Sequence, residues 1–555
     1  PEVIFVAAEA ELRLRRYPEA AARYAELLQK FPNGPHLEEA KVRRALATYF
    51  QKKYDEAVAL IAPEIPKLTD KALLANAHYV VGRARADQRQ FDAAIAALNA
   101  ALAAKPDWPQ ADETLLVLAH CLRSTGKLPE AVQQLAKLVS TFPQSTVLDQ
   151  AIFQLGELAA AQGQLDQALV HYRDVVARFG QGTAAPQAQL GIGLVLYRKD
   201  DPTAAIEALN AVAQKYPKSD VVPRAHYVRA LAQYKLKQYQ PALADVQAFL
   251  AAKPTGDELA DAQLLVGLCQ AGLNQHEPAV ATFAAILAAN PKYPQADQVL
   301  YERAFSLKAL KRDKEAADTF RQLVAASPAS PLAGEALFRV GEFHYDAGQF
   351  AEAVKSYAES LPKATAAPLK EKVLHKLGWC YFKQNDFKSG AATFDQQVAA
   401  VPGGELLGDG LFLAAECYFK QEQWAAAHER YTKVAAAKHP RQHARALYRA
   451  GQCTGSLKNW AASATHYTEL ITTFPKFEQL ADARYGLGWA QQNQNQLAPA
   501  IATYEKVTEE TDSETAAKAR FMIGECYFAQ KQHEQAIEHY LKAAFGYSYE
   551  LWCGN

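Results

Sequence analysis

Small, bulky and polar residues recur along this chain with a nearly constant spacing. The clearest marker is a small residue that follows a short polar turn, which we call the anchor. The fifteen anchors are Ala20, Ala57, Ala94, Ala131, Ala168, Ala205, Ala242, Ala279, Ala316, Ala353, Gly390, Ala427, Ser463, Ala500 and Ala536. From Ala20 to Ala427 the interval is 37 residues eleven times in succession, and the last three intervals are 36, 37 and 36 residues. This register predicts fifteen structural repeats.

Two further positions in each repeat predict a pair of helices. The residue twelve before the anchor is Gly or Ala in every repeat, as at Gly156 and Gly378. The residue four after the anchor is bulky and apolar in every repeat, as at Tyr172 and Phe394. A small residue followed at i+4 by a bulky one marks one buried helix face, and a uniformly small residue indicates a close approach of two helices. We therefore expect helix A followed by helix B in each repeat, with the anchor on B.

Proline positions indicate where helix B begins and ends, because proline is tolerated in the first turn of a helix and beyond its end. Six prolines lie one to three residues before an anchor: Pro18, Pro129, Pro202, Pro241, Pro278 and Pro499. Nine other prolines lie twelve residues after an anchor: Pro32, Pro106, Pro143, Pro217, Pro254, Pro291, Pro328, Pro402 and Pro475. Ser145, Ser219 and Ser330 follow three of these, and we expect them to be N-caps that begin helix A early. An early start would account for the long period.

The order of small residue, turn, small residue, bulky residue and terminal proline resembles the tetratricopeptide repeat, which is normally about 34 residues long. The resemblance covers essentially the whole chain. The longer period and the Phe-Pro-x-Ser ending of helix B are similar to repeats of bacterial envelope proteins, such as the Tol-Pal adaptor and the outer-membrane assembly lipoproteins. The resemblance implies an all-α, right-handed superhelical solenoid of about fifteen antiparallel helix pairs, whose A helices line an inner groove.

We predict one continuous array over residues 1–548 and a short tail at 549–555, since no Gly/Ser-rich linker or charge run divides the chain. Pro1 falls where a helix A would begin, and Asn555 falls where a sixteenth repeat would begin. Further helical repeats, or a segment that anchors the protein, are therefore expected beyond at least one end of the chain.

The charge balance narrows the range of partners. Sixty basic and sixty acidic residues cancel, so the chain lacks the uniform positive charge that nucleic acids and anionic membranes attract. No apolar stretch reaches the roughly 18 to 20 residues of a membrane-spanning helix. We therefore expect neither a nucleic-acid partner nor a direct membrane span.

The seven cysteines are an odd number scattered over the chain, which is not a disulfide framework. Six of them lie ten residues before an anchor: Cys121, Cys269, Cys380, Cys417, Cys453 and Cys526. Most other repeats have Ala or Ser there, such as Ala84 and Ser306. The comparison predicts small buried hydrophobic residues, not nucleophiles or metal ligands. Cys553, in the tail, is the one candidate for a reactive thiol.

No residue pattern predicts catalysis, a metal site or a cofactor. His439 and His443 have the i, i+4 spacing of two ligands on one helix face, but Pro440 interrupts the turn between them. Asp201, directly before Pro202, is better explained as a helix cap than as part of a carboxylate pair. The sequence also lacks a Gly-rich phosphate loop, a nucleophile elbow and a Cys-x-x-Cys pair.

Three positions of helix A, fifteen, eleven and eight residues before the anchor, share one helix face and would line the groove. In repeats ten to fifteen, eleven of these eighteen positions are aromatic, against nine of twenty-seven in repeats one to nine. This gradient predicts a peptide-binding surface in the later repeats. Its residues are Phe338, Glu342, Tyr345, Trp379, Phe382, Phe412, Glu416, Phe419, Tyr448, Tyr485, Trp489, Phe521, Glu525 and Phe528.

Two interpretations of this surface stay open. Aromatic residues at helical spacing are usually core, so packing between neighbouring A helices explains many of the rings. The glutamates among them, Glu342, Glu416 and Glu525, favour a bound peptide that carries Lys or Arg.

The sequence thus favours a non-enzymatic scaffold or adaptor that binds a segment of a partner protein in its groove. The resemblance implies the periplasm or cell envelope of a bacterium, with a cytoplasmic location as the alternative. A second possible function is a structural subunit that self-associates end to end through apolar array ends. An RNA-binding helical repeat is less favoured, because it would read bases with polar side chains on a basic groove. A clamp for a terminal carboxylate is also disfavoured, since the family's clamp has Lys and Asn at groove positions that are mainly aromatic, aliphatic or acidic here.

Overall fold

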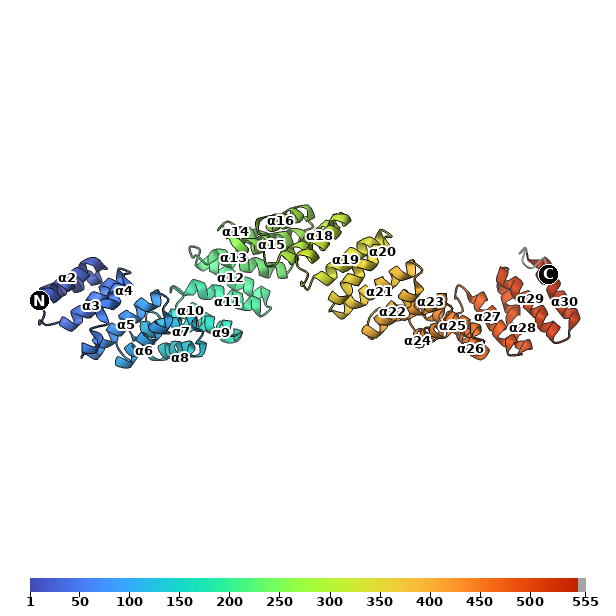
Figure 1. The fold of residues 1–555 in the computed structure, drawn as a ribbon, viewed down its shortest axis with the longest axis horizontal. Helices are drawn as coiled ribbons and strands as arrows, with labels where there is room; N and C mark the ends of the chain where they lie inside the picture. The colour runs from blue at the N-terminus through green and yellow to red at the C-terminus, as the bar shows by residue number, and fades with distance from the viewer. Residues whose placement is uncertain (548–555) are drawn as a thin grey trace. The chain divides into compact units, whose positions relative to one another are not determined.

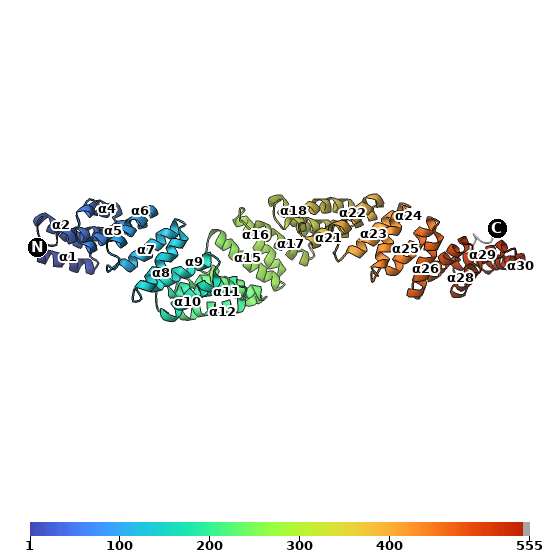
Figure 2. The ribbon, with the colours of Figure 1, turned by 90° about the horizontal axis from the view of Figure 1, so that it is seen from below.

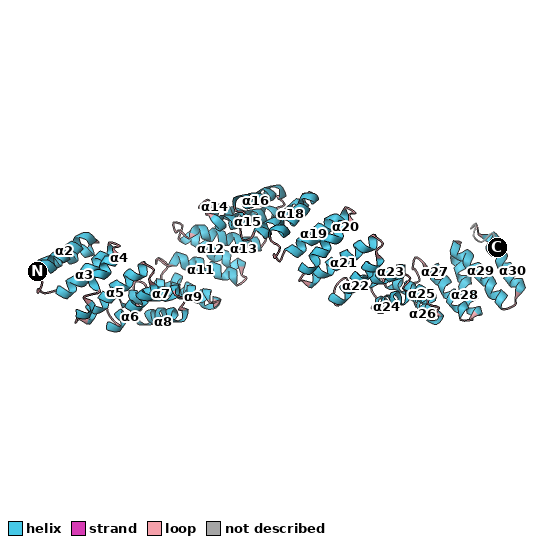
Figure 3. Ribbon diagram, in the orientation of Figure 1, coloured by secondary structure: helices cyan, strands magenta, loops and turns pink. Residues whose placement is uncertain are grey.

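The computed structural model describes residues 1–547, and every regular element in that range is a helix (Figure 3). The predicted all-α helical-repeat fold is confirmed. The chain divides into two compact units, Pro1–Asn274 and Gln275–Asn555. The continuous array over residues 1–548 stays a prediction, and the tail at 549–555, with Cys553, lies outside the described residues.

In the first unit A and B helices alternate, so that odd-numbered α-helices are A and even-numbered ones are B (Figure 1). Its elements are α1 (Glu2–Arg13), α2 (Tyr17–Lys30), α3 (Leu37–Phe50), α4 (Tyr54–Ile61), the 3-10 helix η1 (Ile65–Lys67), α5 (Lys71–Asp87), α6 (Phe91–Ala104), α7 (Ala111–Ser124), α8 (Leu128–Thr141), α9 (Leu148–Ala161), α10 (Leu165–Arg178), α11 (Ala185–Arg198), α12 (Pro202–Lys215), α13 (Val222–Lys235), α14 (Tyr239–Leu250) and α15 (Gly256–Gly272).

The second unit begins on a B helix and continues the alternation. Its elements are α16 (His276–Ala289), α17 (Ala296–Ala309), α18 (Asp313–Ala326), α19 (Ala333–Asp346), α20 (Phe350–Ser360), the 3-10 helix η2 (Leu361–Lys363), α21 (Ala367–Lys383), α22 (Phe387–Ala400), α23 (Leu407–Lys420), α24 (Trp424–Ala436), α25 (His443–Ser456), α26 (Trp460–Thr473), α27 (Leu480–Asn493), α28 (Leu497–Glu510), α29 (Glu514–Ala529) and α30 (His533–Gly546).

The predicted start of helix B is confirmed. Pro202 is the first residue of α12, and the Asp201 carboxylate accepts a hydrogen bond from the Ala204 N–H at 3.0 Å. Asp201 is therefore a helix N-cap, as the sequence indicated.

The prediction that Ser145, Ser219 and Ser330 are N-caps of helix A is wrong. Helix α9 begins three residues after Ser145, and Val147 is at its N-cap position. The Ser145 hydroxyl accepts from the Val147 N–H at 3.1 Å and donates to Asp112 Oδ2 at 2.6 Å. Asp112 is in the first turn of α7, the A helix of the preceding repeat. The serine thus ties a connecting segment to the neighbouring repeat instead of starting a helix.

Ser330 repeats this arrangement in the second unit. Its hydroxyl accepts from the Leu332 N–H at 3.1 Å and donates to Asp297 Oδ2 at 2.5 Å, in the first turn of α17. Ser219 has no acid at the corresponding place in the repeat before it, and it donates to the adjacent Asp220 at 3.3 Å. The hydroxyl is used between repeats wherever the preceding A helix supplies an aspartate.

The long period comes from the connection between helix B and the next helix A. Helices α9 and α10 are 14 residues each, which gives A and B the same length. The turn from A to B takes residues 162–164, and the connection from B to the next A takes residues 179–184. In this repeat an extended connection, not an early start of A, therefore adds the extra residues, whereas α5, α15 and α21 do start early and are 17 residues long.

Helix A ends in the same way in every repeat. The residue five before the anchor has a positive φ in all fifteen repeats, for example 60° at Arg89 and 78° at Gly126. The next N–H then bonds back to a carbonyl five residues earlier, as Gln90 N–H to Arg85 at 2.8 Å. This is the Schellman ending of a helix, here formed mostly by residues other than glycine. It reverses the chain within three residues and lays helix B against helix A.

The predicted close approach of helices A and B is confirmed. The small residue on helix A faces the bulky residue on helix B of the same repeat. A Cβ added at Gly156 would lie 2.6 Å from the Tyr172 ring, and one at Gly378 would lie 2.7 Å from the Phe394 ring. Tyr172 and Phe394 are fully buried. The bulky ring therefore occupies the volume that a side chain on helix A would need.

The same ring also faces the following repeat. A Cβ added at Gly191, on the next A helix, would lie 2.8 Å from Tyr172. Tyr172 is thus held between glycines of two successive A helices, Gly156 and Gly191. The contact inside one repeat and the contact between repeats share one side chain.

The six cysteines of helix A are buried, as predicted. Burial raises the pKa of the thiols, to about 11 for Cys121, Cys269 and Cys526 and to about 12 for Cys380, Cys417 and Cys453. Since the thiolate is the nucleophile, these residues are inert in the folded chain.

We predict that these six thiols do not react with a thiol-specific dye at pH 8 until the protein is unfolded. The measurement uses a Cys553→Ser variant, which removes the cysteine outside the described residues. Six equivalents should react in denaturant and none within minutes in native buffer. Rapid native labelling of two or more thiols would contradict their placement.

We also predict that Gly378→Leu destabilises the protein by about 1 to 3 kcal/mol or more, because overpacking a closed contact forces the two helices apart. The matched control is Gly455→Leu in α25. Gly455 lies eight residues before its anchor, where seven other repeats carry Tyr or Phe, and a Cβ added there would have Ser463 Oγ as its nearest neighbour, at 3.5 Å. Thermal melts followed by circular dichroism should show a loss at 378 only; equal shifts would mean that the position is not specially confined.

Candidate functional site

The A helices form a layer in each unit. Neighbouring A helices contact one another, as α5 contacts α7 and α9 contacts α11 in the first unit, and α25 contacts α27 in the second. Inside a unit, a B helix packs between the A helix before it and the A helix after it, as α10 does with α9 and α11. Figure 2 shows the same succession of paired helices from a second direction. The predicted groove positions therefore follow one another along the A layer of a unit.

The rings fifteen residues before the anchor pack inside their own repeat. Each lies against the bulky ring of helix B, with ring centroids 5.2 to 6.2 Å apart. The pairs are Phe338–Tyr357, Phe412–Tyr431, Tyr448–Tyr467, Tyr485–Tyr504 and Phe521–Tyr540. This supports the packing interpretation of these five residues, but the partner is helix B rather than the neighbouring helix A.

The rings eight residues before the anchor pack across the turn between A and B. Each contacts the aromatic residue that begins helix B, with ring centroids 4.9 to 5.5 Å apart. The pairs are Tyr345–Phe350, Phe382–Phe387, Phe419–Trp424 and Phe528–His533. The left-handed residue of the turn brings these positions together, so much of the aromatic gradient is structural.

Two of the predicted residues remain clearly exposed. Trp489 on α27 is 40% exposed and Phe528 on α29 is 56% exposed. Trp379 is half-buried, and its indole N–H donates to His375 Nε2 at 3.1 Å. Large apolar side chains that are accessible on an otherwise packed layer are the usual anchors of a protein interface.

The predicted glutamates are already engaged within the chain to different degrees. Glu416 accepts from the Tyr431 hydroxyl at 2.5 Å and forms an ion pair with Arg449, of the next A helix, at 2.9 Å. Glu342 pairs with Lys376 at 3.0 Å.

Glu525 accepts from the Tyr540 hydroxyl at 2.6 Å, and it forms no ion pair within residues 1–547. Among the three predicted glutamates it is therefore the one that no cation of the described residues pairs with.

The first unit holds a hollow that the aromatic gradient did not predict. It has a volume of about 570 Å³ and is lined by residues of α3, α5, α7 and α9. At its centre, the Arg83 guanidinium donates to the hydroxyls of Tyr49 at 3.2 Å and Tyr79 at 3.0 Å. Tyr49 donates to Asp87 at 2.7 Å, and Tyr79 donates to Glu113 at 2.6 Å. We call it the Arg83 hollow.

The Arg83 hollow combines a fixed polar network with apolar walls. Burial, with the hydrogen bond to Asp87, raises the pKa of Tyr49 to about 12, so the hydroxyl stays protonated and keeps donating. Leu116, Val117 and Val147 supply the apolar lining. Tyr49 and Arg83 occupy groove positions, eight and eleven residues before their anchors. Counting aromatic residues missed the site, because its central residue is an arginine held by two tyrosines.

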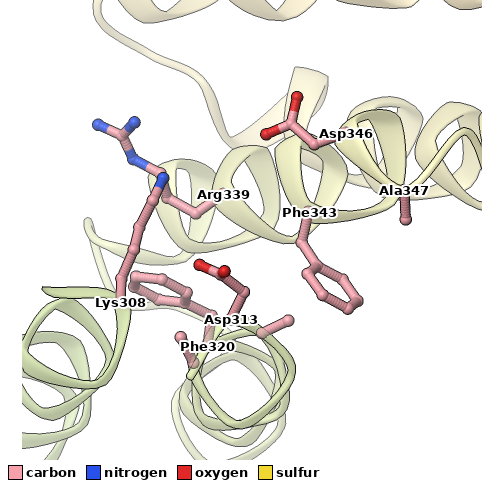
Figure 4. A pocket seen from close by; sticks show the side chains of 9 residues that line it. Lys308, Asp313, Phe320, Arg339, Phe343, Asp346 and Ala347 are labelled. Atoms are coloured by element: carbon pink, nitrogen blue, oxygen red, sulfur yellow. The ribbon is translucent and has the colours of Figure 1, made fainter. Parts of the chain in front are cut away.

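A smaller pocket of about 290 Å³ lies between α17, α18 and α19 (Figure 4). Phe343 extends from α19 toward α18, which begins at Asp313 (Figure 4). Phe343 occupies the position where most repeats have Cys, Ala or Ser, and its ring lines the pocket. Lys308 and Arg339 add positive charge beside Asp313. The pocket has room for one side chain of a partner.

The remaining chemical signals have ordinary places in the fold. His443 is the first residue of α25, and His439 precedes it in the connection. Within residues 1–547, no group of three or more His, Cys, Asp or Glu side chains is arranged to hold a metal ion. In the same range no helix is both long and apolar enough to cross a membrane.

Two protein families match the sequence. The family described as tetratricopeptide repeat matches residues 153–220, 412–478 and 485–550. The family described as outer membrane lipoprotein matches residues 1–158 and 191–339, which is more than half of the chain. No curated protein is a significant match.

Several solved structures are similar to this chain. The anaphase-promoting-complex hetero-tetramer Cut9–Hcn1 is 12% identical, with 88% of this chain and 96% of that chain covered and a TM-score of 0.32. A tetratricopeptide repeat protein from Parabacteroides merdae is 19% identical, with coverages of 47% and 96% and a TM-score of 0.29. The MamA protein is 17% identical, with coverages of 33% and 94% and a TM-score of 0.29.

We predict opposite effects for one substitution at two equivalent tyrosines. Tyr431 and Tyr357 both lie four residues after an anchor and both are fully buried. Tyr431→Phe removes the bond to Glu416 and should cost about 1.5 to 3 kcal/mol, since its acceptor is charged. The Tyr357 hydroxyl is buried without a partner among the described residues, so Tyr357→Phe should be neutral or stabilising.

Urea unfolding of the two variants, compared with the unsubstituted chain, checks this pair. Equal losses of unfolding free energy in the two variants would contradict the prediction, because only the Tyr431 hydroxyl has a hydrogen bond, to Glu416, that the substitution removes.

Proposed function

Because the chain belongs to the tetratricopeptide repeat proteins and, within them, to the outer membrane lipoprotein family, we propose that it is a non-enzymatic scaffold that binds a segment of a partner protein along its A helices. Repeats of this kind generally mediate protein–protein interaction.

The accessible aromatic residues of the second unit are the observation on which the proposal rests. Trp489 and Phe528 stand eleven and eight residues before their anchors, on A helices α27 and α29. The neighbouring rings Tyr485 and Phe521 are used in packing, which leaves these two as exposed apolar groups on a supported surface. Aromatic side chains fixed by a rigid scaffold lose little entropy on binding, so they are effective contact residues.

The chemistry of the surface favours a partner segment that carries a Lys or Arg beside an apolar residue. Glu525 is one turn before Phe528 on the same helix, and it has no ion pair within the described range. A cation bound there would pair with the carboxylate and lie beside an aromatic ring. Glu342 and Glu416 contribute less, because a partner would have to displace Lys376 or Arg449.

We propose the cell envelope of a bacterium as the location, on the basis of the match to the outer membrane lipoprotein family. Fractionation of the native organism checks this proposal. Recovery of the protein with the periplasmic or membrane fraction is expected, and recovery with the cytoplasm would contradict it.

End-to-end self-association is a second candidate function, and exposed apolar residues on the terminal helices favour it. Val3 on α1 is 82% exposed, and Ile537 on α30 is 58% exposed. In inner repeats the residue that corresponds to Ile537 is buried, as at Val280 and Ile501, or half-buried, as at Val354. Light scattering over a concentration series distinguishes a filament-forming subunit, whose mass rises steadily, from a scaffold of constant mass.

We predict that a photoreactive amino acid placed at Trp489 or Phe528 crosslinks to one discrete protein partner in cells of the native organism. The matched control is Val170 on the B helix α10, which is 65% exposed but lies off the A layer. Adducts are expected at 489 and 528 and not at 170, because the partner segment would lie along the A helices. Mass spectrometry of the adduct identifies the partner and the residue that is crosslinked.

Adducts of equal yield at all three positions would point to non-specific contact. Adducts at 170 alone would move the binding surface to the B helices and overturn the proposal. A partner segment without a basic residue would remove the proposed role of Glu525 while leaving the aromatic contacts in place.

A further inference from the structure

Two histidines of successive B helices face each other in the second unit. His428 is on α24 and His466 is on α26, and their Nε2 atoms are 3.0 Å apart. The ring centroids are 5.2 Å apart at an interplanar angle of 63°. Both side chains are half-buried, so solvent reaches the space between them. Neither histidine belongs to the A layer.

The positions of the two histidines in their repeats explain why they meet only here. His466 lies three residues after its anchor, and His171 and His539 occupy the same position in other repeats. His428 lies one residue after the anchor of the preceding repeat, where the repeats before His171 and His539 have Val132 and Ile501. Only at α24 and α26, within the described residues, does the register bring two imidazoles together.

A neutral imidazole has one ring nitrogen with a free lone pair, which can accept a hydrogen bond or coordinate a metal ion. Of two neutral imidazoles with facing Nε2 atoms, either one donates a proton to the other, or both coordinate a third atom.

We propose that His428 and His466 form a binding site for a divalent transition metal of the Cu²⁺ and Ni²⁺ class. Metal–imidazole bonds of about 2.0 to 2.1 Å place two nitrogens 3.0 Å apart when the angle at the metal is about 90°. That angle is typical of square-planar and tetragonal sites, which Cu²⁺ and Ni²⁺ prefer, while Zn²⁺ prefers a wider tetrahedral angle. The site is independent of the proposed binding of a protein partner.

A hydroxyl and a carboxylate lie on the same two helices as the histidines. The Thr432 hydroxyl is 3.3 Å from His428 Nε2, and Glu469 is one turn after His466 on α26. Glu469 has a half-exposed side chain, 3.8 Å from His443 Nε2. Water fills the remaining positions, so two protein ligands from adjacent repeats hold the ion and couple α24 to α26.

The test is a titration of the metal-free full-length protein with Cu²⁺, by calorimetry in the presence of a weak competing chelator. The variants are His428→Gln and His466→Gln, with His171→Gln as the control that removes a histidine from the same repeat position. Circular dichroism of each metal-free variant reports folding. Electron paramagnetic resonance of the unsubstituted protein with one equivalent of Cu²⁺ counts the coordinated nitrogens.

The unsubstituted protein and His171→Gln should bind one equivalent equally well. His428→Gln and His466→Gln should each weaken it by about 10- to 100-fold or more, since loss of a ligand costs at least as much as loss of an outer-shell partner. The spectrum should show two nitrogen ligands. Unchanged affinity in both folded variants, or a spectrum with fewer than two nitrogens, would overturn the site and leave the pair as a hydrogen bond that shares a proton. If a variant fails to fold, the number of nitrogen ligands in the electron paramagnetic resonance spectrum of the unsubstituted protein decides whether the site exists.

Discussion

The close contact between a small residue of helix A and a bulky residue of helix B is the constraint on which each unit depends. The Tyr172 ring occupies the space of an absent side chain at Gly156, and it also faces Gly191 of the next repeat. One buried ring therefore determines both the distance within a repeat and the distance to the following one. Because no central core exists in such a stack, stability is a sum of these neighbouring contacts.

This constraint determines which side chains are left for function. The rings fifteen residues before the anchor pack on the bulky ring of B, and the rings eight residues before it pack across the turn. Residues that packing covers least, such as Trp489 and Phe528, are the ones that stay accessible. In the Arg83 hollow of the first unit, Tyr49 packs on Tyr54 and Tyr79 packs on Trp108, while the hydroxyls of both tyrosines accept from Arg83.

Sequence reasoning succeeded where a contact recurs at a fixed place in every repeat. The small and bulky positions, the buried cysteines and the prolines of helix B could all be predicted, since each signal is repeated up to fifteen times. It failed where the partner of a side chain lies in another repeat and varies. Ser145 was assigned to a helix cap because its acceptor, Asp112, lies 33 residues away.

The candidate site was predicted less well than the fold for the same reason. The sequence favours Glu416 as a partner for a bound cation, but Arg449 of the next repeat, 33 residues later, already forms an ion pair with it. The contact between Phe419 and Trp424 depends on the left-handed residue Glu422 in the turn, and a glutamate carries no signal for that conformation. The repeat period identifies which residues share one helix face. How exposed each side chain is depends on its contacts with other residues, such as Arg449 and Trp424, which the period does not reveal.

A double-mutant cycle at Gly156 and Tyr172 tests the central claim most directly. The variants are Gly156→Leu, Tyr172→Ala and the combination of the two, with local stability read from hydrogen exchange of the amides in α9 and α10. If the two positions share one volume, leucine fills the space that the ring leaves, and the double variant should lose less than the sum of the single losses by about 0.5 to 3 kcal/mol. Simple addition of the two losses would contradict the account, because it would mean that the glycine and the ring do not confine each other.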